Sequence, residues 1–227
     1  MTTPRWSPDL LNRMKRDWDQ RALENARYYV ATEQPEWSDQ DFFQSGEATV
    51  KGEIIAEFTE ICRGRFPADM RVLEIGCGAG RVTRALARLF GQVEAVDVSG
   101  EMIQQARAAL QGSANVCFHR NNGVDLSMFG AEEFDFAFSS IVFQHIPSKA
   151  VVEHYIRETW RVLRPGSIFK FQVQGFALDE ANCDTWVGVG FSEQEMRDIA
   201  EHSRYKVGRV VGAGTQYFWL TFYKSEG

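Results

Sequence analysis

The sequence predicts an α/β protein with a doubly wound, seven-stranded, mainly parallel sheet, an antiparallel C-terminal hairpin and an N-terminal helical cover. Three observations predict it. From residue 71 onwards, short apolar runs alternate with amphipathic stretches, as in βαβ units. A glycine-rich segment, Gly76–Gly80, follows the first apolar run. The last two apolar runs have no helical pattern between them and are joined by Gly212-Ala213-Gly214, which indicates a hairpin.

The N-terminal part carries helix signals. Ser7 and Pro8 suit the N-cap and first helical position, and apolar residues three or four apart predict a helix over Ser7–Ala31. The polar stretch Thr32–Gly46 contains a proline and predicts a loop, and a second helix is expected from about Glu47 to Arg63.

The rest of the chain alternates regularly. Strands are predicted over Arg71–Ile75, Val93–Val98, Val116–Arg120, Phe134–Ser140, Ile168–Val173, Tyr205–Val211 and Gln216–Tyr223. Helices are predicted over Arg81–Phe90, Ser99–Gln111 and Ser148–Leu163, the last stopped by Pro165-Gly166, and from a capping box formed by Ser192 and Glu195.

These elements suggest how the chain divides. We expect residues 1–65 to form a helical extension and residues 66–227 an α/β domain with an insertion at 174–190. The extension serves either as a lid or as a dimer contact, and the sequence leaves both interpretations open, a homodimer included.

The composition narrows the function classes. The 227 residues carry 25 basic and 31 acidic side chains, a net charge of −6, which argues against a nucleic-acid partner. No apolar run approaches the roughly 20 residues of a membrane-spanning helix, and residues 1–18 lack the apolar core of a signal peptide. We therefore expect a cytoplasmic protein that does not act at a membrane. The four cysteines, which we interpret as free thiols, show no metal-ligand spacing, and neither do Asp179, Glu180 and Asp184, so no metal is expected.

The most informative motif is the glycine-rich segment with its acidic partner. Glycines between a strand and a helix let the backbone turn tightly and approach a ligand. Asp97 ends the next predicted strand, 21 residues after Gly76, where a carboxylate can accept hydrogen bonds from ribose hydroxyls. The sixth place of the motif is Arg81 instead of the glycine of dinucleotide-binding turns, and no P-loop lysine follows. The pattern favours a nucleoside-type ligand over a dinucleotide.

This motif resembles motif I of the class I S-adenosylmethionine-dependent methyltransferases, whose fold is Rossmann-like. Further segments are similar to those of small bacterial members: Val93–Ile103, Phe118–Leu126, Phe134–Pro147, Arg161–Phe169 and Tyr217–Lys224. The resemblance implies that S-adenosyl-L-methionine is the cofactor and S-adenosyl-L-homocysteine the product. It implies cofactor contacts from Glu74, Gly76, Cys77, Gly78, Gly80, Arg81, Asp97, Val98, Met102, Asn122, Gly123, Val124 and Ser139.

Asn122 departs from the family pattern, which often has aspartate there. Its side-chain oxygen can accept a hydrogen bond from the adenine amino group. Asn122 is followed by Gly123, and Asn-Gly is also a strong turn signal. Both interpretations stay open and are compatible.

The resemblance implies methyl transfer to O or N of a small-molecule acceptor, which mainly requires alignment of donor and acceptor. His145, just past the fourth strand, is the candidate base or acceptor contact; the alternative is a histidine that hydrogen-bonds a backbone carbonyl. Aromatic residues are candidates for the acceptor pocket, because ring faces attract the cationic sulfonium. The expected contacts are Tyr28, Tyr29, Trp37, Phe143, His145 and Trp186. Phe42, Phe43 and Phe176 are further candidates for the pocket, and Trp18 is expected to pack in the core.

Two other function classes remain as alternatives: a nucleotide-linked oxidoreductase of the NAD type, and a non-catalytic protein that binds S-adenosylmethionine. A basic cluster near the N-terminus is interpreted as a solvated helix face and contains Arg13, Lys15, Arg16 and Arg21.

Overall fold

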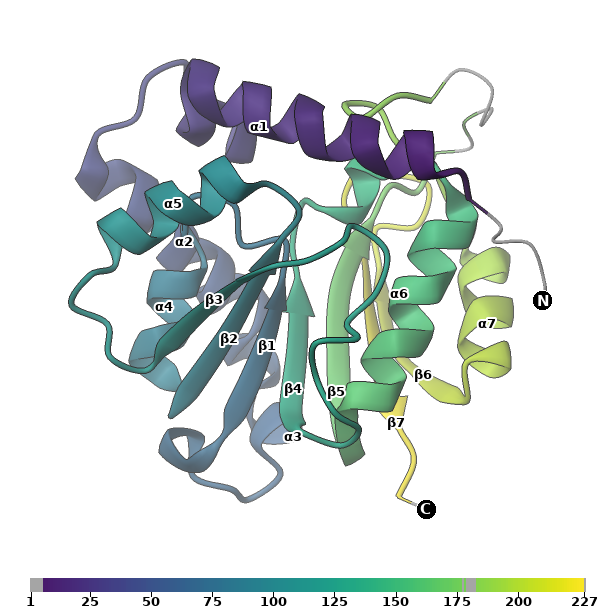
Figure 1. Cartoon of the computed structure of the whole chain (residues 1–227). Helices are drawn as coiled ribbons and strands as arrows, with labels where there is room; N and C mark the ends of the chain where they lie inside the picture. The colour runs from purple at the N-terminus through teal and green to yellow at the C-terminus, as the bar shows by residue number, and fades with distance from the viewer. Residues whose placement is uncertain (1–5, 177, 179–182, 227) are drawn as a thin grey trace. The chain divides into compact units, whose positions relative to one another are not determined.

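The computed structural model describes residues 6–176, 178 and 183–226, and the chain divides into two compact units (Figure 1). The turn unit comprises residues 16–120, and the hairpin unit comprises residues 1–15 and 121–227. The sequence instead predicts a boundary at residue 65, between a helical extension and an α/β domain. That boundary stays a prediction.

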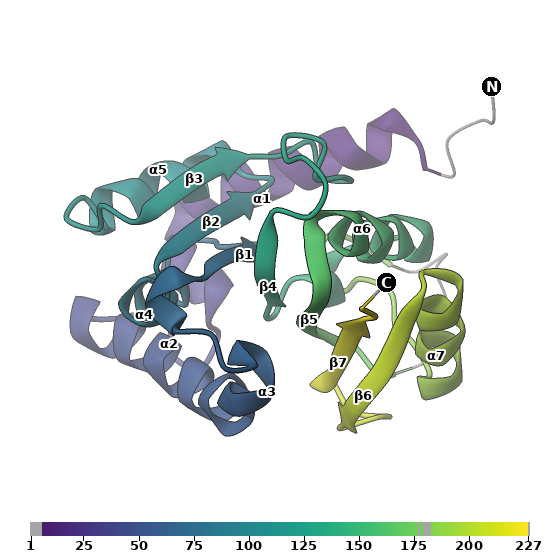
Figure 2. The ribbon, with the colours of Figure 1, turned by 90° about the horizontal axis from the view of Figure 1, so that it is seen from below.

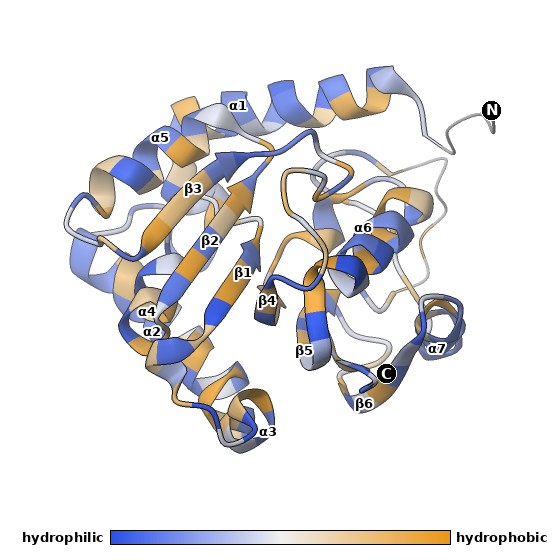
Figure 3. Ribbon diagram, turned by 60° about the horizontal axis from the view of Figure 1, so that its bottom comes forward, coloured by the Kyte–Doolittle hydropathy of each residue, from blue (hydrophilic) through white to orange (hydrophobic). Residues whose placement is uncertain are grey.

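The turn unit is built on three parallel strands in the order β3-β2-β1. They are β1 (Arg71–Ile75), β2 (Gln92–Asp97) and β3 (Val116–Arg120). Figure 2 shows α5 (Gly100–Ala109) on one face of these strands and α4 (Thr83–Leu89) on the other. Hydrophobic and hydrophilic residues alternate along β2 in Figure 3, and both β1 and β2 are mostly buried, as expected for strands with helices on both faces.

The first helix begins where the sequence predicts, with Ser7 as its N-cap. α1 spans Pro8–Val30, and the Leu10 N–H donates to Ser7 Oγ at 3.2 Å. Its regular geometry is interrupted at Asn25, where φ is −167° and ψ is 82°. The Tyr28 N–H donates to Asn25 Oδ1 at 3.1 Å, so Asn25 acts as an N-cap for the last turn of the helix.

The predicted loop over Thr32–Gly46 is wrong in its second half, because α2 spans Asp39–Glu53. Ser38 is the N-cap, and its Oγ accepts the Asp41 N–H at 3.1 Å. The cap and two aspartates in the first turn favour a helix start there. The helix expected to reach Arg63 is interrupted as well: a 3₁₀ turn over Ile55–Glu57 leads into α3 (Phe58–Cys62).

The hairpin unit holds four strands in the order β4-β5-β7-β6. β4 (Phe134–Ser139) and β5 (Leu163–Val173) are parallel, whereas β7 (Phe218–Lys224) is antiparallel to both β5 and β6 (Tyr205–Val211). The C-terminal hairpin predicted from the sequence is therefore confirmed.

Two helices accompany these strands. α6 (Lys149–Val162) lies against β5 and α7 (Glu193–His202) against β6. The capping box predicted at Ser192 and Glu195 is present.

Pro165-Gly166 does not separate α6 from β5. The helix ends at Val162, and the two residues lie inside β5, which starts five residues earlier than predicted. The pairing of β4 with β5 shifts its register between Phe134 and Phe136, as at a β-bulge. Because a bulge leaves residues outside the ladder, it can accommodate a proline without losing a hydrogen bond.

The fold class is confirmed: the described residues supply seven strands, mostly parallel, and helices that cover them. No helix in the described part of the chain is long and apolar enough to cross a membrane. Most of the aromatic content is core. Phe134, Phe136, Phe143, Phe169, Phe171, Phe218 and Phe222 are all fully buried.

Candidate functional site

The glycine turn, Gly76–Arg81, connects β1 to the segment that leads into α4. Gly76, Gly78 and Gly80 have φ of 77°, 51° and 86°, a region that favours glycine. A Cβ on Gly78 would lie 2.7 Å from Val30 Cγ2, and one on Gly80 would lie 2.9 Å from Leu110 Cδ1. Conformation and close packing therefore both require glycine at these positions.

Asp97, at the end of β2, closes this turn. Its Oδ2 accepts the Gly78 N–H at 2.8 Å, and its Oδ1 accepts the Ser99 N–H at 2.8 Å. Burial raises the pKa of Asp97, and the backbone hydrogen bonds from Ser99 and Gly78 oppose that rise. Each carboxylate oxygen keeps a second lone pair that can accept a ligand hydroxyl.

Three buried polar groups beside the turn have no hydrogen-bond partner among the described residues: Glu74 Oε2, Arg81 Nε and Thr83 Oγ1. Burial raises the pKa of Glu74 to about 7, although Thr83 and Arg81 favour its ionised form. An unsatisfied buried carboxylate is costly, and a cationic ligand group would offset that cost.

Arg81 turns toward α2. Its Nη1 donates to Thr49 Oγ1 at 3.0 Å and lies 3.4 Å from Ser45 Oγ. A Cβ on Gly46 would lie 2.0 Å from the Arg81 carbonyl oxygen, so α2 packs directly on the backbone of the turn. Arg81 therefore anchors α2 to the turn.

The remaining predicted cofactor residues of the turn unit lie close to the motif. Cys77 is buried, and burial raises the pKa of its thiol well above its usual value, so it is inert as a nucleophile. Met102 is 1% exposed and belongs to an apolar cluster with Ala79 and Leu110. Val98, which follows β2, is half-buried, and its carbonyl oxygen accepts from Arg120 Nε at 3.2 Å.

In the hairpin unit, Asn122 adopts the turn role. Its Oδ1 accepts the N–H groups of Val124 at 2.9 Å and Asp125 at 3.0 Å, so both lone pairs of that oxygen are used. Gly123 has φ of 86°. The geometry favours the turn interpretation of Asn122 over that of an adenine acceptor, and Val124 is buried beside it.

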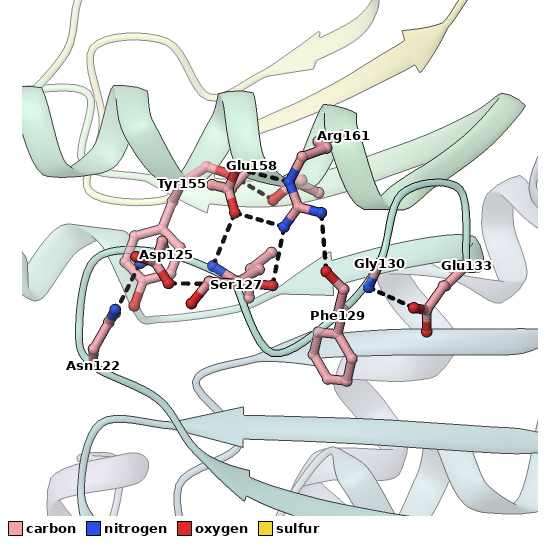
Figure 4. A network of polar contacts seen from close by, with 11 residues as sticks. Asn122, Asp125, Ser127, Phe129, Gly130, Glu133, Tyr155, Glu158 and Arg161 are labelled. Atoms are coloured by element: carbon pink, nitrogen blue, oxygen red, sulfur yellow. Dashed lines mark hydrogen bonds and ion pairs between the residues drawn. The ribbon is translucent and has the colours of Figure 1, made fainter.

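The segment after Asn122 is held by α6 (Figure 4). Arg161 donates through Nη1 to the Phe129 carbonyl at 2.9 Å and through Nη2 to the Leu126 carbonyl at 3.1 Å. Glu158 pairs with Arg161 at 2.7 Å, and this contact lowers the pKa of Glu158. These bonds give the loop a fixed conformation without regular secondary structure.

His145 lies in the post-β4 loop, residues 140–147, and is 7% exposed. Its Nδ1 is 2.6 Å from the Trp186 carbonyl oxygen, and its Nε2 is 3.2 Å from Gln144 Nε2. Its ring stacks on that of Trp186, with centroids 5.0 Å apart. The carbonyl-bonded alternative is therefore present, and this loop contacts the insertion around Trp186. Ser139, just before the loop, is fully buried.

The other aromatic candidates divide by burial. Phe143, Phe42 and Phe43 are buried in the core, and their place in an acceptor pocket stays a prediction. Trp37 packs on the core, with its Nε1–H donating to the Ala31 carbonyl at 2.8 Å, and Trp18 packs there as expected.

The aromatic residues that keep some exposed surface remain candidates for the acceptor pocket. Tyr28 and Tyr29 are half-buried, and the Tyr29 hydroxyl donates to Glu24 at 2.9 Å. Phe176 is 47% exposed.

Sequence reasoning missed residues that shape these regions. Gly46 carries a readable signal, because a glycine inside a helix suggests close packing. Gln144 and Gln172 are buried amides that no pattern distinguishes from surface glutamines, and Ile141 has φ of 57° without being glycine.

The charged residues considered in the sequence are acidic ones in the insertion and basic ones near the N-terminus. The described residues contain no cluster of His, Cys, Asp or Glu that could hold a metal; Asp179 and Glu180 lie outside them. In the basic cluster, Arg13 and Arg16 are exposed and Arg21 lies over the Trp18 ring at 4.8 Å, as expected for a helix face.

The chain matches a family described as a methyltransferase domain over residues 72–166. It is 33% identical over 101 residues to a ubiquinone biosynthesis O-methyltransferase of Xanthomonas axonopodis pv. citri (strain 306). That alignment covers 44% of this chain and 41% of the relative, so the chain matches less than half of the relative's length.

Solved structures share the fold. A SAM-dependent methyltransferase from Aquifex aeolicus has a TM-score of 0.58 at 22% identity and covers 83% of this chain and 100% of its own. The geranyl diphosphate C-methyltransferase from Streptomyces coelicolor A3(2), solved with Mg²⁺, geranyl diphosphate and S-adenosyl-L-homocysteine, has a TM-score of 0.69 at 14% identity. It covers 98% of this chain and 100% of its own. The match over residues 72–166 and the shared fold support the resemblance of the sequence to the class I S-adenosylmethionine-dependent methyltransferases.

Proposed function

We propose that the protein is an enzyme that transfers a methyl group from S-adenosylmethionine to O or N of a small-molecule acceptor. One observation carries the proposal: the glycine turn is closed by Asp97 and bordered by a buried carboxylate, Glu74, whose Oε2 has no partner among the described residues. The protein therefore already holds a carboxylate that can bind sugar hydroxyls, Asp97, and one that can bind a cation, Glu74.

The residues of the turn unit fit this cofactor. The free lone pairs of Asp97 can accept ribose hydroxyls, and Glu74 can accept hydrogen bonds from an ammonium group. The glycines let the backbone of the turn adopt positive φ without strain. When bound, the cofactor supplies an electrophilic methyl group on a sulfonium.

The acceptor class has weaker support. The O-methyltransferase relatives favour an oxygen nucleophile, and the net charge of −6 favours a small molecule over a nucleic acid. A similar fold also carries C-methylation in the Streptomyces protein, so a carbon nucleophile belongs in the test.

The test has two stages. In thermal unfolding, S-adenosylhomocysteine at about 100 times its Kd stabilises the protein by about 2.7 kcal/mol, whereas NAD does not. Purified protein is then incubated with S-adenosylmethionine and a panel of phenols, carboxylates, amines and activated carbon acids, and released S-adenosylhomocysteine is measured. Stabilisation by NAD alone would overturn the proposal in favour of the oxidoreductase. Binding without turnover on the whole panel would support the non-catalytic alternative.

A further inference from the structure

A chain of buried amides runs through the hairpin unit from the post-β4 loop to the insertion. Gln172 of β5 is 0% exposed, and its Oε1 accepts the Ile141 N–H at 3.1 Å. Its Nε2 donates to Gln144 Oε1 at 2.8 Å. Gln144 Nε2 is 3.2 Å from His145 Nε2, and His145 Nδ1 is 2.6 Å from the Trp186 carbonyl oxygen. We call Gln172, Gln144 and His145 the amide chain.

Backbone groups fix the direction of the amide chain at both ends. The Ile141 N–H can only donate and the Trp186 carbonyl can only accept. Gln172 cannot reverse its amide, because its Nε2 lies 2.8 Å from three acceptors, Gln144 Oε1 and the carbonyl oxygens of Val173 and Gln216, which share its two hydrogens. Gln144 must then present its NH₂ group to His145.

This direction sets the protonation of the imidazole. Nδ1 faces a carbonyl oxygen and carries the proton, whereas Nε2 faces an amide NH₂ and accepts. A second proton on Nε2 would face the two donors of Gln144. Asp184, two residues before Trp186, accepts the Trp186 and Val187 N–H groups through its Oδ1 and so fixes the backbone that presents the indole.

Packing makes the arrangement rigid. The Gly188 N–H donates to the Gln144 carbonyl at 2.9 Å, and the Val189 N–H donates to the Ile146 carbonyl at 3.0 Å. A Cβ on Gly188 would lie 2.6 Å from Ile146 N. The insertion is thus bonded along the post-β4 loop on both sides of His145.

We propose that Gln172 and Gln144 are positioning residues that lock His145 as the neutral Nδ1–H tautomer. His145 then holds the Trp186 indole as one wall of the acceptor site, and its Nε2 lone pair accepts from Gln144 instead of serving as the base. The acceptor part of this statement rests on the proposed methyl transfer. The tautomer and the order of the insertion do not.

The first test is ¹H–¹⁵N spectroscopy of the histidine rings in the full-length protein at pH 7.5, assigned by loss of one signal set in His145→Gln. We expect the neutral Nδ1–H pattern for His145, which is opposite to the tautomer that free neutral histidine favours. An Nε2–H pattern or a doubly protonated ring in the wild-type protein would overturn the proposal, whatever the variants do.

The second test reverses the chain at one atom. In Gln144→Glu a carboxylate still accepts from Gln172 but now faces His145 Nε2, so the ring should become doubly protonated at pH 7.5. Gln111→Glu adds the same charge at an exposed turn and should leave the ring unchanged. An unchanged ring in a folded Gln144→Glu protein would contradict the proposal.

The third test separates positioning from general stability. With an acceptor found as above, Gln172→Met should raise the acceptor KM about tenfold and change kcat less than about threefold, because it loosens the wall without removing a reacting group. The Kd of S-adenosylhomocysteine by calorimetry should stay unchanged. Equal losses in kcat and donor affinity would sink the positioning role, whereas absence of donor binding in the wild-type protein would refute the proposed function and leave the tautomer result standing.

Discussion

The glycine turn of one unit and the post-β4 loop of the other solve the same conformational problem in opposite ways. Both need backbone with positive φ. The turn uses Gly76, Gly78 and Gly80, and Glu74 Oε2 beside it has no partner among the described residues. The loop instead holds a β-branched residue, Ile141, at φ of 57°, and the Ile141 N–H donates to Gln172 Oε1. A β-branched residue in this region is unusual and costs on the order of 1–2 kcal/mol.

The difference indicates what each region is for. Unstrained backbone with unsatisfied polar groups is suited to an external ligand, and the turn therefore follows a pattern shared with other proteins that bind one. The loop is completed by this chain's own Gln172 and Gln144. Its form depends on side-chain partners far away in sequence, so it should differ between relatives with different acceptors.

The largest expected effect concerns the close contact under the turn. In Gly46→Ala the new Cβ would lie 2.0 Å from the Arg81 carbonyl oxygen, so α2 must move off the turn. We expect a loss of about 2–4 kcal/mol in the free energy of unfolding, measured by urea denaturation.

Gly52→Ala on the same helix is the matched control. Its Cβ would meet nothing within 4 Å, and alanine should stabilise the helix by up to about 1 kcal/mol. Similar effects of the two substitutions would show that α2 does not pack on the turn.

Asp97 comes next. The side-chain amide introduced by Asp97→Asn has one acceptor oxygen for two backbone donors, Gly78 N–H and Ser99 N–H, so the substitution leaves one of them facing an NH₂ group. We expect the Kd of S-adenosylhomocysteine to rise about 100-fold in calorimetry. Asp69→Asn, an exposed change of the same kind, should leave it unaltered; wild-type affinity in Asp97→Asn would remove the turn from the donor site.

The glycine turn could be predicted from the sequence better than the post-β4 loop, for physical reasons. The spacing from Gly76 to Asp97 is local to one strand–helix–strand unit, so it can be read along the chain. The partners of Gln172 are Ile141, Gln144 and Gln216, far apart in sequence. Phe42 and Phe43 were assigned to a pocket because their helix was predicted as a loop; with Ser38 recognised as an N-cap, both would have been placed on a packed helix.

A smaller effect follows from Glu74, whose pKa burial raises to about 7 from an ordinary value of 4.5. Between these values the folded protein binds a proton that the unfolded chain has released, so stability falls as pH rises from 4.5 to 7. An ammonium group on the ligand favours the ionised form of Glu74. Below pH 7, the affinity for the donor should therefore increase as pH rises, by up to about tenfold per pH unit.

Calorimetry at pH 6 in two buffers of different ionisation enthalpy should accordingly detect proton release on binding. Glu74→Gln should abolish the release and flatten the pH profile. Binding at pH 6 without proton release in the wild-type protein would mean that Glu74 is already ionised or does not face the ligand.

The smallest effect probes the strained residue of the loop. Ile141→Gly removes a conformational penalty of about 1–2 kcal/mol but adds unfolded-state entropy and loses a half-buried side chain, so the free energy of unfolding should stay within about 1 kcal/mol of the wild type. Val142→Gly, at φ of −123°, has no such strain to relieve and should cost at least about 1 kcal/mol more. Both are compared by urea denaturation with equal m-values. Equal losses at the two neighbouring positions would mean that Ile141 does not hold positive φ in solution, and the contrast between an unstrained turn and a strained loop would fail.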